Sequence, residues 1–181
     1  MLYRPGDQVI YILANNGGNF TQVFASHAGI GGYDLLNPKD RVFALDYKSS
    51  GKLDHLVLYR PGDQVIYILA NNGGNFTQVF ASHAGIGGYD LLNPKDRVFA
   101  FDYKSSGKLD HLVLYRPSDQ VIYILANNGG NFTPVFKSHA GIGGYDLADP
   151  ADKVFAFDYN SSGKLNHLVL YRPGTGTIWI L

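Results

Sequence analysis

A Tyr-Asp pair follows a Gly-Ile-Gly-Gly run at three places in the chain, and a histidine stands two residues before each run. An aromatic ring stacks well on the C–H face of a sugar, and a carboxylate accepts hydrogen bonds from the sugar hydroxyls. This combination favours a carbohydrate site on a surface loop. The candidate ligand-binding residues are His27, Tyr33, Asp34, His83, Tyr89, Asp90, His139, Tyr145 and Asp146.

A structural role is the alternative for the same residues. Each tyrosine can instead be buried with its hydroxyl bonded, and a histidine repeated at one position is more often a structural hydrogen-bonding residue than a ligand. The Gly-Ile-Gly-Gly run lacks the spacing and the following helix of a phosphate-binding loop. We attribute its glycines to positive φ angles or to the close approach of a neighbour.

No catalytic or metal-binding constellation is visible. A second histidine set, His55, His111 and His167, enters a predicted strand. His55 follows Asp54 directly, and since consecutive strand residues face opposite ways, we expect no dyad between them. Zinc requires three or four converging ligands, and the serines lack the context of a nucleophile elbow. We therefore expect no enzyme and no cofactor.

Residues 101–113, Phe-Asp-Tyr-Lys-Ser-Ser-Gly-Lys-Leu-Asp-His-Leu-Val, resemble the loop of FG-GAP or VCBS-type propeller repeats. Those repeats carry an acidic, glycine-containing turn between two strands, commonly around calcium, followed by Asp-Leu-Val and a Tyr-Arg-Pro-Gly-like turn. The resemblance covers roughly a third of each repeat. It implies a β-propeller that is usually extracellular and often serves adhesion or carbohydrate binding.

The acidic turn departs from that family where calcium would bind. A calcium loop needs oxygen donors at its first, third, fifth and ninth positions. The third position is Lys48 or Lys104 in the first two copies, and its ammonium can neutralise the neighbouring carboxylates. We therefore expect a metal-free turn, with calcium binding as the alternative. The acidic residues of this degenerate loop are Asp46, Asp54, Asp102, Asp110 and Asp158.

All these residues recur because the chain is built from a strict repeat of 56 residues. We treat repeats 2–57, 58–113 and 114–169 and the partial repeat 170–181 as a single domain. The first two copies differ at one position, and the third differs from the second at nine. Such identity indicates recent duplication or deliberate design, and a start inside a repeat indicates a cut-down or engineered chain. Every copy meets nearly the same environment.

The second repeat predicts four strands, at roughly 54–60, 64–70, 76–82 and 97–103, joined by turns rich in Gly, Asn and Pro. No segment shows a convincing 3.6-residue period, so helix should be scarce. Both faces of the strands are apolar, whereas a sheet with one wet face alternates apolar and polar residues. Such strands fit β-propeller blades, which pack between neighbouring sheets. A β-trefoil, which also has three four-stranded repeats, is the alternative.

The composition agrees with an all-β fold, since the chain has 13 Tyr, 11 Phe and 22 Gly. The formal net charge of zero argues against a nucleic-acid groove and against a polybasic membrane patch. No apolar run approaches the roughly 18 residues that span a bilayer. The absence of cysteine excludes disulfides and thiolate metal sites.

Three blades do not close a ring, and an open arc exposes two apolar blade faces. We therefore expect a homo-oligomer, in the first place a dimer, whose end segments exchange strands. The leading functional hypothesis is non-catalytic, multivalent carbohydrate binding, in an architecture that resembles the small fucose lectins built from short repeat chains. The alternative is a symmetric self-assembling scaffold, designed or excised, with no ligand. We expect the natural parent to be secreted.

Overall fold

The computed structural model describes residues 1–181 and contains fourteen β-strands and no helix. The chain therefore has no helix that is long and apolar enough to cross a membrane. The strands form four antiparallel sheets, which we call the first to fourth blades. The first two blades are β1 (Leu2–Arg4), β2 (Val9–Asn15) and β3 (Phe20–Ser26), then β4 (Arg41–Leu45), β5 (His55–Arg60), β6 (Val65–Asn72) and β7 (Asn75–Ser82). The last two are β8 (Arg97–Phe101), β9 (His111–Arg116), β10 (Val121–Asn128) and β11 (Asn131–Ser138), then β12 (Lys153–Phe157), β13 (His167–Arg172) and β14 (Thr177–Ile180).

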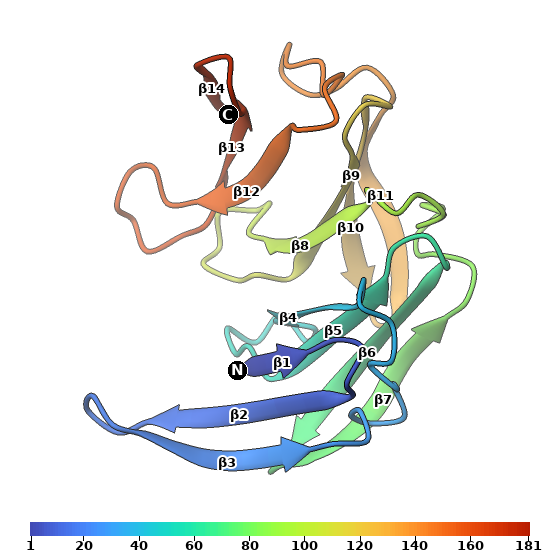
Figure 1. Ribbon diagram of the computed structural model, residues 1–181. Helices are drawn as coiled ribbons and strands as arrows, with labels where there is room; N and C mark the ends of the chain where they lie inside the picture. Colours follow the sequence, from blue (N-terminus) through green and yellow to red (C-terminus); the bar gives the residue numbers. More distant parts are fainter.

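The blades follow one another around an arc (Figure 1). The opening strands of the second, third and fourth blades contact one another along the inner side of this arc, β4 with β8 and β8 with β12. Each sheet is separate and packs against its neighbours, as propeller blades do. The predicted all-β propeller architecture is confirmed, and the β-trefoil alternative is wrong because the strands remain in separate radial sheets.

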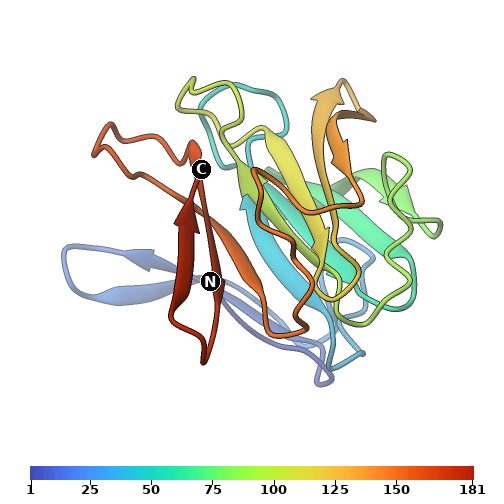
Figure 2. The same ribbon diagram turned by 90° about the horizontal axis from the view of Figure 1, so that it is seen from above.

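The two end blades are incomplete in complementary ways. By the repeat of 56 residues, β1–β3 correspond to β5–β7, so the first blade lacks the inner strand. The fourth blade corresponds to β8–β10 and lacks the outer strand. Both chain ends lie on the same, open side of the arc (Figure 2).

Strand bounds differ from the sequence prediction at two turns. The strand expected over 97–103 ends at Phe101, because Asp102 begins the acidic turn and binds the backbone amides of Ser106 and Gly107. The hairpin between β6 and β7 is tighter than expected, since Asn72 pairs with Asn75 and only two glycines form the turn. Both have positive φ angles, 70° and 93°, which a two-residue turn of this type requires.

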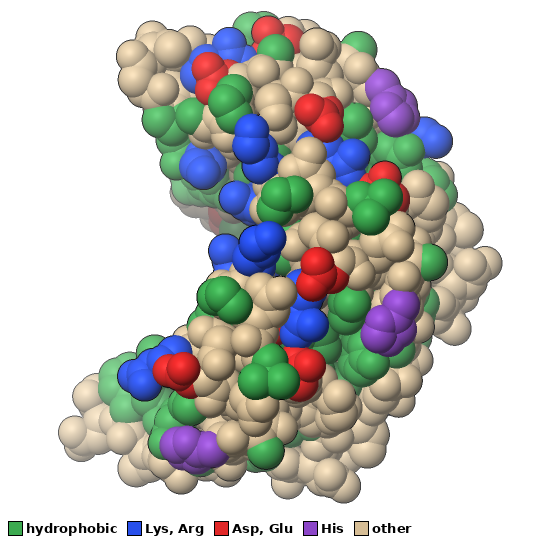
Figure 3. Space-filling model, turned by 45° about the vertical axis from the view of Figure 1, so that its right-hand side comes forward, with side chains coloured by type: hydrophobic (Ala, Val, Ile, Leu, Met, Phe, Trp, Pro, Cys, Tyr) green, Lys and Arg blue, Asp and Glu red, His purple; other side chains and the backbone are tan.

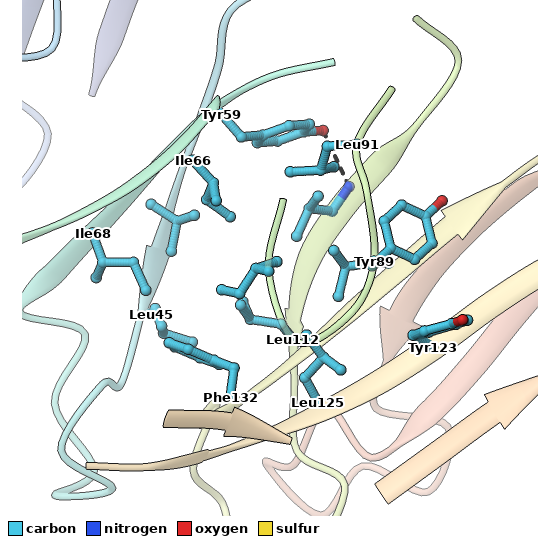
Figure 4. Close-up of a cluster of buried hydrophobic side chains, with 14 residues drawn as sticks. Leu45, Tyr59, Ile66, Ile68, Tyr89, Leu91, Leu112, Tyr123, Leu125 and Phe132 are labelled. Atoms are coloured by element: carbon cyan, nitrogen blue, oxygen red, sulfur yellow. Dashed lines mark hydrogen bonds between the residues drawn. The ribbon is translucent and has the colours of Figure 1, made fainter. Parts of the chain in front are cut away.

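The core lies between blades and uses both faces of each strand, as the two-sided apolar pattern predicts. Between the second and third blades, β5 and β6 present one set of side chains and β9 and β10 face them (Figure 4). The loop that links the blades adds Tyr89 and Leu91 to the same cluster. The Tyr59 hydroxyl accepts a hydrogen bond from the Val98 amide at 3.1 Å, which ties the second blade to the inner strand of the third.

Leu112→Ala should lower the free energy of unfolding by about 3 kcal/mol, because Leu112 is fully buried in this cluster and its truncation leaves a cavity. Val79→Ala is the control, since Val79 lies on β7 at the outer rim and is 40% exposed. It should change stability by less than about 0.5 kcal/mol. Chemical denaturation at a fixed protein concentration measures both, and equal effects would contradict a core between blades.

Candidate functional site

A completely buried carboxylate organises the junction between the first and second blades. Asp40 Oδ1 accepts hydrogen bonds from the Tyr33 hydroxyl and Arg60 Nε, both at 2.7 Å. Asp40 Oδ2 accepts from Arg60 Nη2 at 3.0 Å and from the Asn37 amide at 3.1 Å. All four bonds reach one side chain, so the burial of its charge is compensated by a guanidinium, a phenol hydroxyl and a backbone amide.

The same cluster forms at the next two junctions. Asp96 binds Tyr89 and Arg116, and Asp152 binds Tyr145 and Arg172 in the same arrangement. Burial, together with the bond to the carboxylate, raises the pKa of each tyrosine above its usual range. Each phenol therefore stays neutral and donates a hydrogen bond to the aspartate.

A second aspartate joins the cluster from the surface. Arg60 Nη2 donates to Asp34 Oδ1 at 2.6 Å, and the Asp34 side chain is about half exposed. Partial burial opposes ionisation of Asp34, but hydrogen bonds from the Leu36 amide and from Arg60 outweigh it and lower its pKa. The Arg60 guanidinium also lies over the Tyr33 ring, 5.6 Å from its centroid.

The glycine-rich loop holds the Tyr-Asp pair in place. In the second copy of this loop, two backbone hydrogen bonds between Ile86 and Tyr89, both of 2.9 Å, close a tight turn. Gly85 has a φ of 75°, and a Cβ there would lie 1.9 Å from the Tyr89 carbonyl oxygen. Leu91 also has a positive φ, 54°, and is held there by complete burial. The glycines therefore serve backbone geometry, as the structural interpretation predicts.

A hollow of about 80 Å³ opens beside this cluster, at the surface where the first and second blades meet. Loop residues Gly32 and Asp34 form one wall, and Arg60, Tyr67 and His83 of the second blade form the other. The Tyr67 hydroxyl is hydrogen-bonded to His83 Nε2 at 3.3 Å. A matching hollow of about 70 Å³ lies at the next junction, lined by Asp90, Arg116, Tyr123 and His139 among others. Histidine side chains lie at separated places along one face of the crescent (Figure 3).

Each hollow combines the Tyr-Asp pair of one repeat with the histidine of the following repeat, not with the histidine that precedes the pair in the sequence. Tyr33 and Asp34 meet His83 of the following repeat, and Tyr89 and Asp90 meet His139. His27 lies on the first blade, bonded to the Tyr11 hydroxyl at 3.0 Å. The third pair, Tyr145 and Asp146, has no such histidine beside it, because the fourth blade lacks the outer strand that would carry one.

The role expected for the tyrosines of these pairs needs correction. Tyr33 is 3% exposed, and its ring contacts Arg60 and, edge-on, Tyr67. Tyr89 and Tyr145 are equally buried. They cannot serve as exposed platforms for a sugar ring, because other side chains cover them. Ligand binding in the hollow itself stays a prediction, with the half-buried Tyr67 and the little that is exposed of Tyr33 lining it.

The carboxylates of the degenerate calcium loop bind groups of the chain itself. Asp46 is buried and accepts hydrogen bonds from the amides of Ser50 at 2.8 Å and Gly51 at 2.6 Å. Asp102 and Asp158 bind the corresponding amides of their own turns. The aspartate at the ninth position acts elsewhere, since Asp110 accepts a bond of 2.6 Å from the Ser49 hydroxyl of the preceding blade.

The expectation that Asp54 and His55 do not interact is wrong. His55 Nδ1 donates to Asp54 Oδ1 at 2.6 Å, and His111 and Asp110 form the same pair. Asp54 precedes β5 rather than lying in it, so the alternation of strand faces does not separate the two side chains. Both histidines are buried, and the Nε2 atom of each has no hydrogen-bond partner in the chain.

Sequence reasoning missed the residues that hold the site together. Asp40 stands in a predicted loop and Arg60 at the end of the strand predicted over 54–60, and no catalytic pattern singles out either residue. One signal was present. An aspartate and an arginine stand 20 residues apart in every copy, and both survive in the third copy among its nine changes.

Asp96→Ala should lower the free energy of unfolding by about 3–5 kcal/mol, because it leaves the guanidinium and phenol of Arg116 and Tyr89 without their buried partner. Asp119→Ala is the matched control. Asp119 also approaches Arg116, at 4.0 Å, but is half exposed, so its loss should cost less than about 0.5 kcal/mol. Denaturant titration separates the two, and a mild effect of Asp96→Ala would contradict the central role of the buried carboxylate.

Stability should also fall in acid. Partial burial raises the pKa values of Asp90 and Asp152, but hydrogen bonds outweigh it, so both lie below the usual value of about 3.9 in the unfolded chain. The ionised carboxylates therefore stabilise the fold fully above about pH 4, and this contribution is lost as the pH falls through their folded pKa values. Unfolding midpoints between about pH 2 and 7 test this, and Asp90→Asn should flatten the acid limb. A stability that rises below about pH 4 would contradict the assignment.

No known family model and no curated protein matches the sequence. Among solved structures, the chain is similar to part of the Tc holotoxin pore of Photorhabdus luminescens, with a TM-score of 0.59 and 20% identity over 95% of this chain and 8% of that one. A Lactobacillus plantarum protein matches with a TM-score of 0.48 and 14% identity, over 96% of this chain and 47% of that one, which is too distant to carry an argument. The chain thus spans less than half of either protein, and the likeness to the first supports the propeller-like fold alone.

Proposed function

We propose that the chain is a non-catalytic, multivalent carbohydrate-binding module. The observation that carries this proposal is the hollow at the blade junction, which occurs twice with the same lining residues. Asp34 Oδ1 is occupied by Arg60 and the Leu36 amide, while its Oδ2 has no partner in the chain. Arg60 uses Nε and Nη2, and its Nη1 makes no hydrogen bond within the protein.

A fixed acceptor beside a fixed donor suits neighbouring hydroxyls on a sugar ring, because each hydroxyl both donates and accepts. Tyr67 and His83 line the same hollow and add an aromatic edge and a further polar nitrogen. The bonds from Asp40 and Leu36 hold Arg60 and Asp34 before any ligand arrives, so little ordering is needed on binding.

Shallow hollows of 70–80 Å³ enclose only one edge of a monosaccharide, so each site alone should bind weakly. Several identical sites on one rigid arc compensate, since a second contact to a branched or clustered glycan is intramolecular. The resemblance to FG-GAP and VCBS-type repeats supports the same function and an extracellular natural parent.

A self-assembling scaffold without ligand is the second candidate. It is favoured by the extent to which Arg60 is already neutralised by Asp34 and Asp40, which leaves a weak field for a ligand. It is also favoured by the near identity of the repeats. A glycan array at high protein concentration distinguishes the two functions, because a scaffold gives no signal.

Asp34→Asn combined with Asp90→Asn should lower the affinity of these two hollows for the best glycan of that array about tenfold or more, because each of them loses a charged acceptor. Asp63→Asn is the control, since Asp63 is exposed in the turn after β5 and lies outside the hollow. Calorimetric titration measures both variants. A blank array, or unchanged affinity in the double variant, rejects the proposed site.

A further inference from the structure

We propose that a second copy of this chain completes the fourth blade, and that the partner's His27 completes the third junction hollow. In the shared blade, β12 comes from one chain and the outer strand, β3, from the other. The middle strands come from one of two competing hairpins, because residues 2–13 and 170–181 match at eight of twelve positions. The proposal that this hollow binds a sugar rests on the proposed function. The assembly of two copies does not depend on it.

The fourth blade exposes a face that is buried elsewhere in the chain. Ile178 and Ile180 are 64% and 41% exposed, while their equivalents in the third blade, Ile122 and Ile124, are 0% and 2% exposed. Phe157 is likewise 42% exposed, whereas its equivalent Phe101 is 5% exposed because the fourth blade covers it. The open face therefore has the composition of a blade-to-blade interface, and a blade of the same repeat fits it.

The chain itself shows what the missing contact looks like. Between the second and third blades, the Tyr47 ring lies 6.3 Å from the Phe132 ring, and the Tyr47 carbonyl accepts a hydrogen bond of 2.7 Å from Asn127. One repeat further on, Tyr103 occupies the place of Tyr47 but is 43% exposed, and no phenylalanine ring packs against it from the fourth blade.

The missing counterparts stand at the other end of the molecule. Phe20 is the repeat equivalent of Phe132 and is 65% exposed, whereas Phe132 is 6% exposed. Asn15, the equivalent of Asn127, ends β2 and is also exposed. Tyr103 of one copy and Phe20 with Asn15 of another are therefore the two halves of a contact that the chain already makes once internally.

The third hollow is divided in the same way. The fourth blade follows the loop with Tyr145 and Asp146 but has no histidine at the position of His83 and His139, and the first blade holds His27 without a Tyr-Asp loop before it. Joining the two ends places the partner's His27 where His83 and His139 stand in the complete hollows. Each chain then carries three hollows instead of two, and Trp179 of the fourth blade stands at the position of Tyr67 and Tyr123.

Two copies are enough to close the ring. Both open ends lie on the same side of the crescent, so one partner reaches both of them (Figures 1 and 3). Sharing the end blades gives three blades per chain and six in a dimer, which is within the usual range of about four to eight, whereas a trimer would give nine. A dimer with two-fold symmetry makes two identical junctions.

Light scattering and native mass spectrometry test the assembly. The expected mass is twice the 19.9 kDa of the chain, and a folded monomer at micromolar concentration overturns the proposal. Phe20→Asp should raise the dimer dissociation constant at least a hundredfold, and so should Tyr103→Asp, since each removes one half of the contact. Val79→Asp is the control on the outer rim and should leave the mass unchanged.

Mixing the two variants guards against simple misfolding. A Phe20→Asp chain keeps an intact Tyr103, and a Tyr103→Asp chain keeps an intact Phe20, so a mixed dimer has one unaltered junction. The mixture should therefore recover dimer mass that neither variant shows alone. A mixture that remains monomeric, although circular dichroism shows both chains folded, overturns the shared-blade arrangement.

The shared hollow has its own readout. Titration with a methyl glycoside of the sugar that binds best on the array should give three sites per chain, and His27→Ala should reduce this to two without changing the mass. Three sites in His27→Ala overturn the shared hollow. If no glycan binds while the dimer forms, the proposed function fails and the assembly stands.

Discussion

Each junction between blades depends on a carboxylate that has no access to solvent and yet carries four hydrogen bonds. Asp40 joins the loop that follows one blade to the arginine at the end of a strand in the next. A buried charge is tolerated only when every one of its acceptor positions is used, so this cluster allows only one relative placement of the loop and the blade. The hydrophobic faces supply most of the stabilisation, and the carboxylate fixes the geometry with which they meet.

The same cluster explains why structure and candidate function are difficult to separate here. Arg60 bonds the buried Asp40 on one side and the exposed Asp34 on the other, with one nitrogen left over at the surface. Tyr33, which the sequence suggested as a ligand platform, is used entirely inside the junction. Only the outer layer, formed by Asp34, Tyr67, His83 and the unbonded Nη1 of Arg60, remains available to a ligand.

Patterns of two-sided apolar strands and a strict repeat were sufficient to predict the propeller blades, because burial on both faces has few other solutions. The site was only partly predictable. The loop residues Tyr33 and Asp34 were found because they stand next to a glycine run. Their true neighbours, Tyr67 and His83, come from the following repeat, and no local pattern reveals which repeat a loop will contact. The role of Asp40 was missed because its partner Arg60 is 20 residues away, at the end of the strand that pairs with β4.

The spacing of the junction residues along the chain determines how the number of repeats can change. A complete junction, from Tyr33 to His83, spans fewer residues than the 56 of one period, although it straddles two blades. Duplicating or deleting any one period therefore adds or removes a whole junction together with its charges, wherever the crossover falls. Unequal recombination can change the number of blades without ever leaving a buried aspartate unpaired, so ring size is free to vary while the chemistry of every junction stays constant.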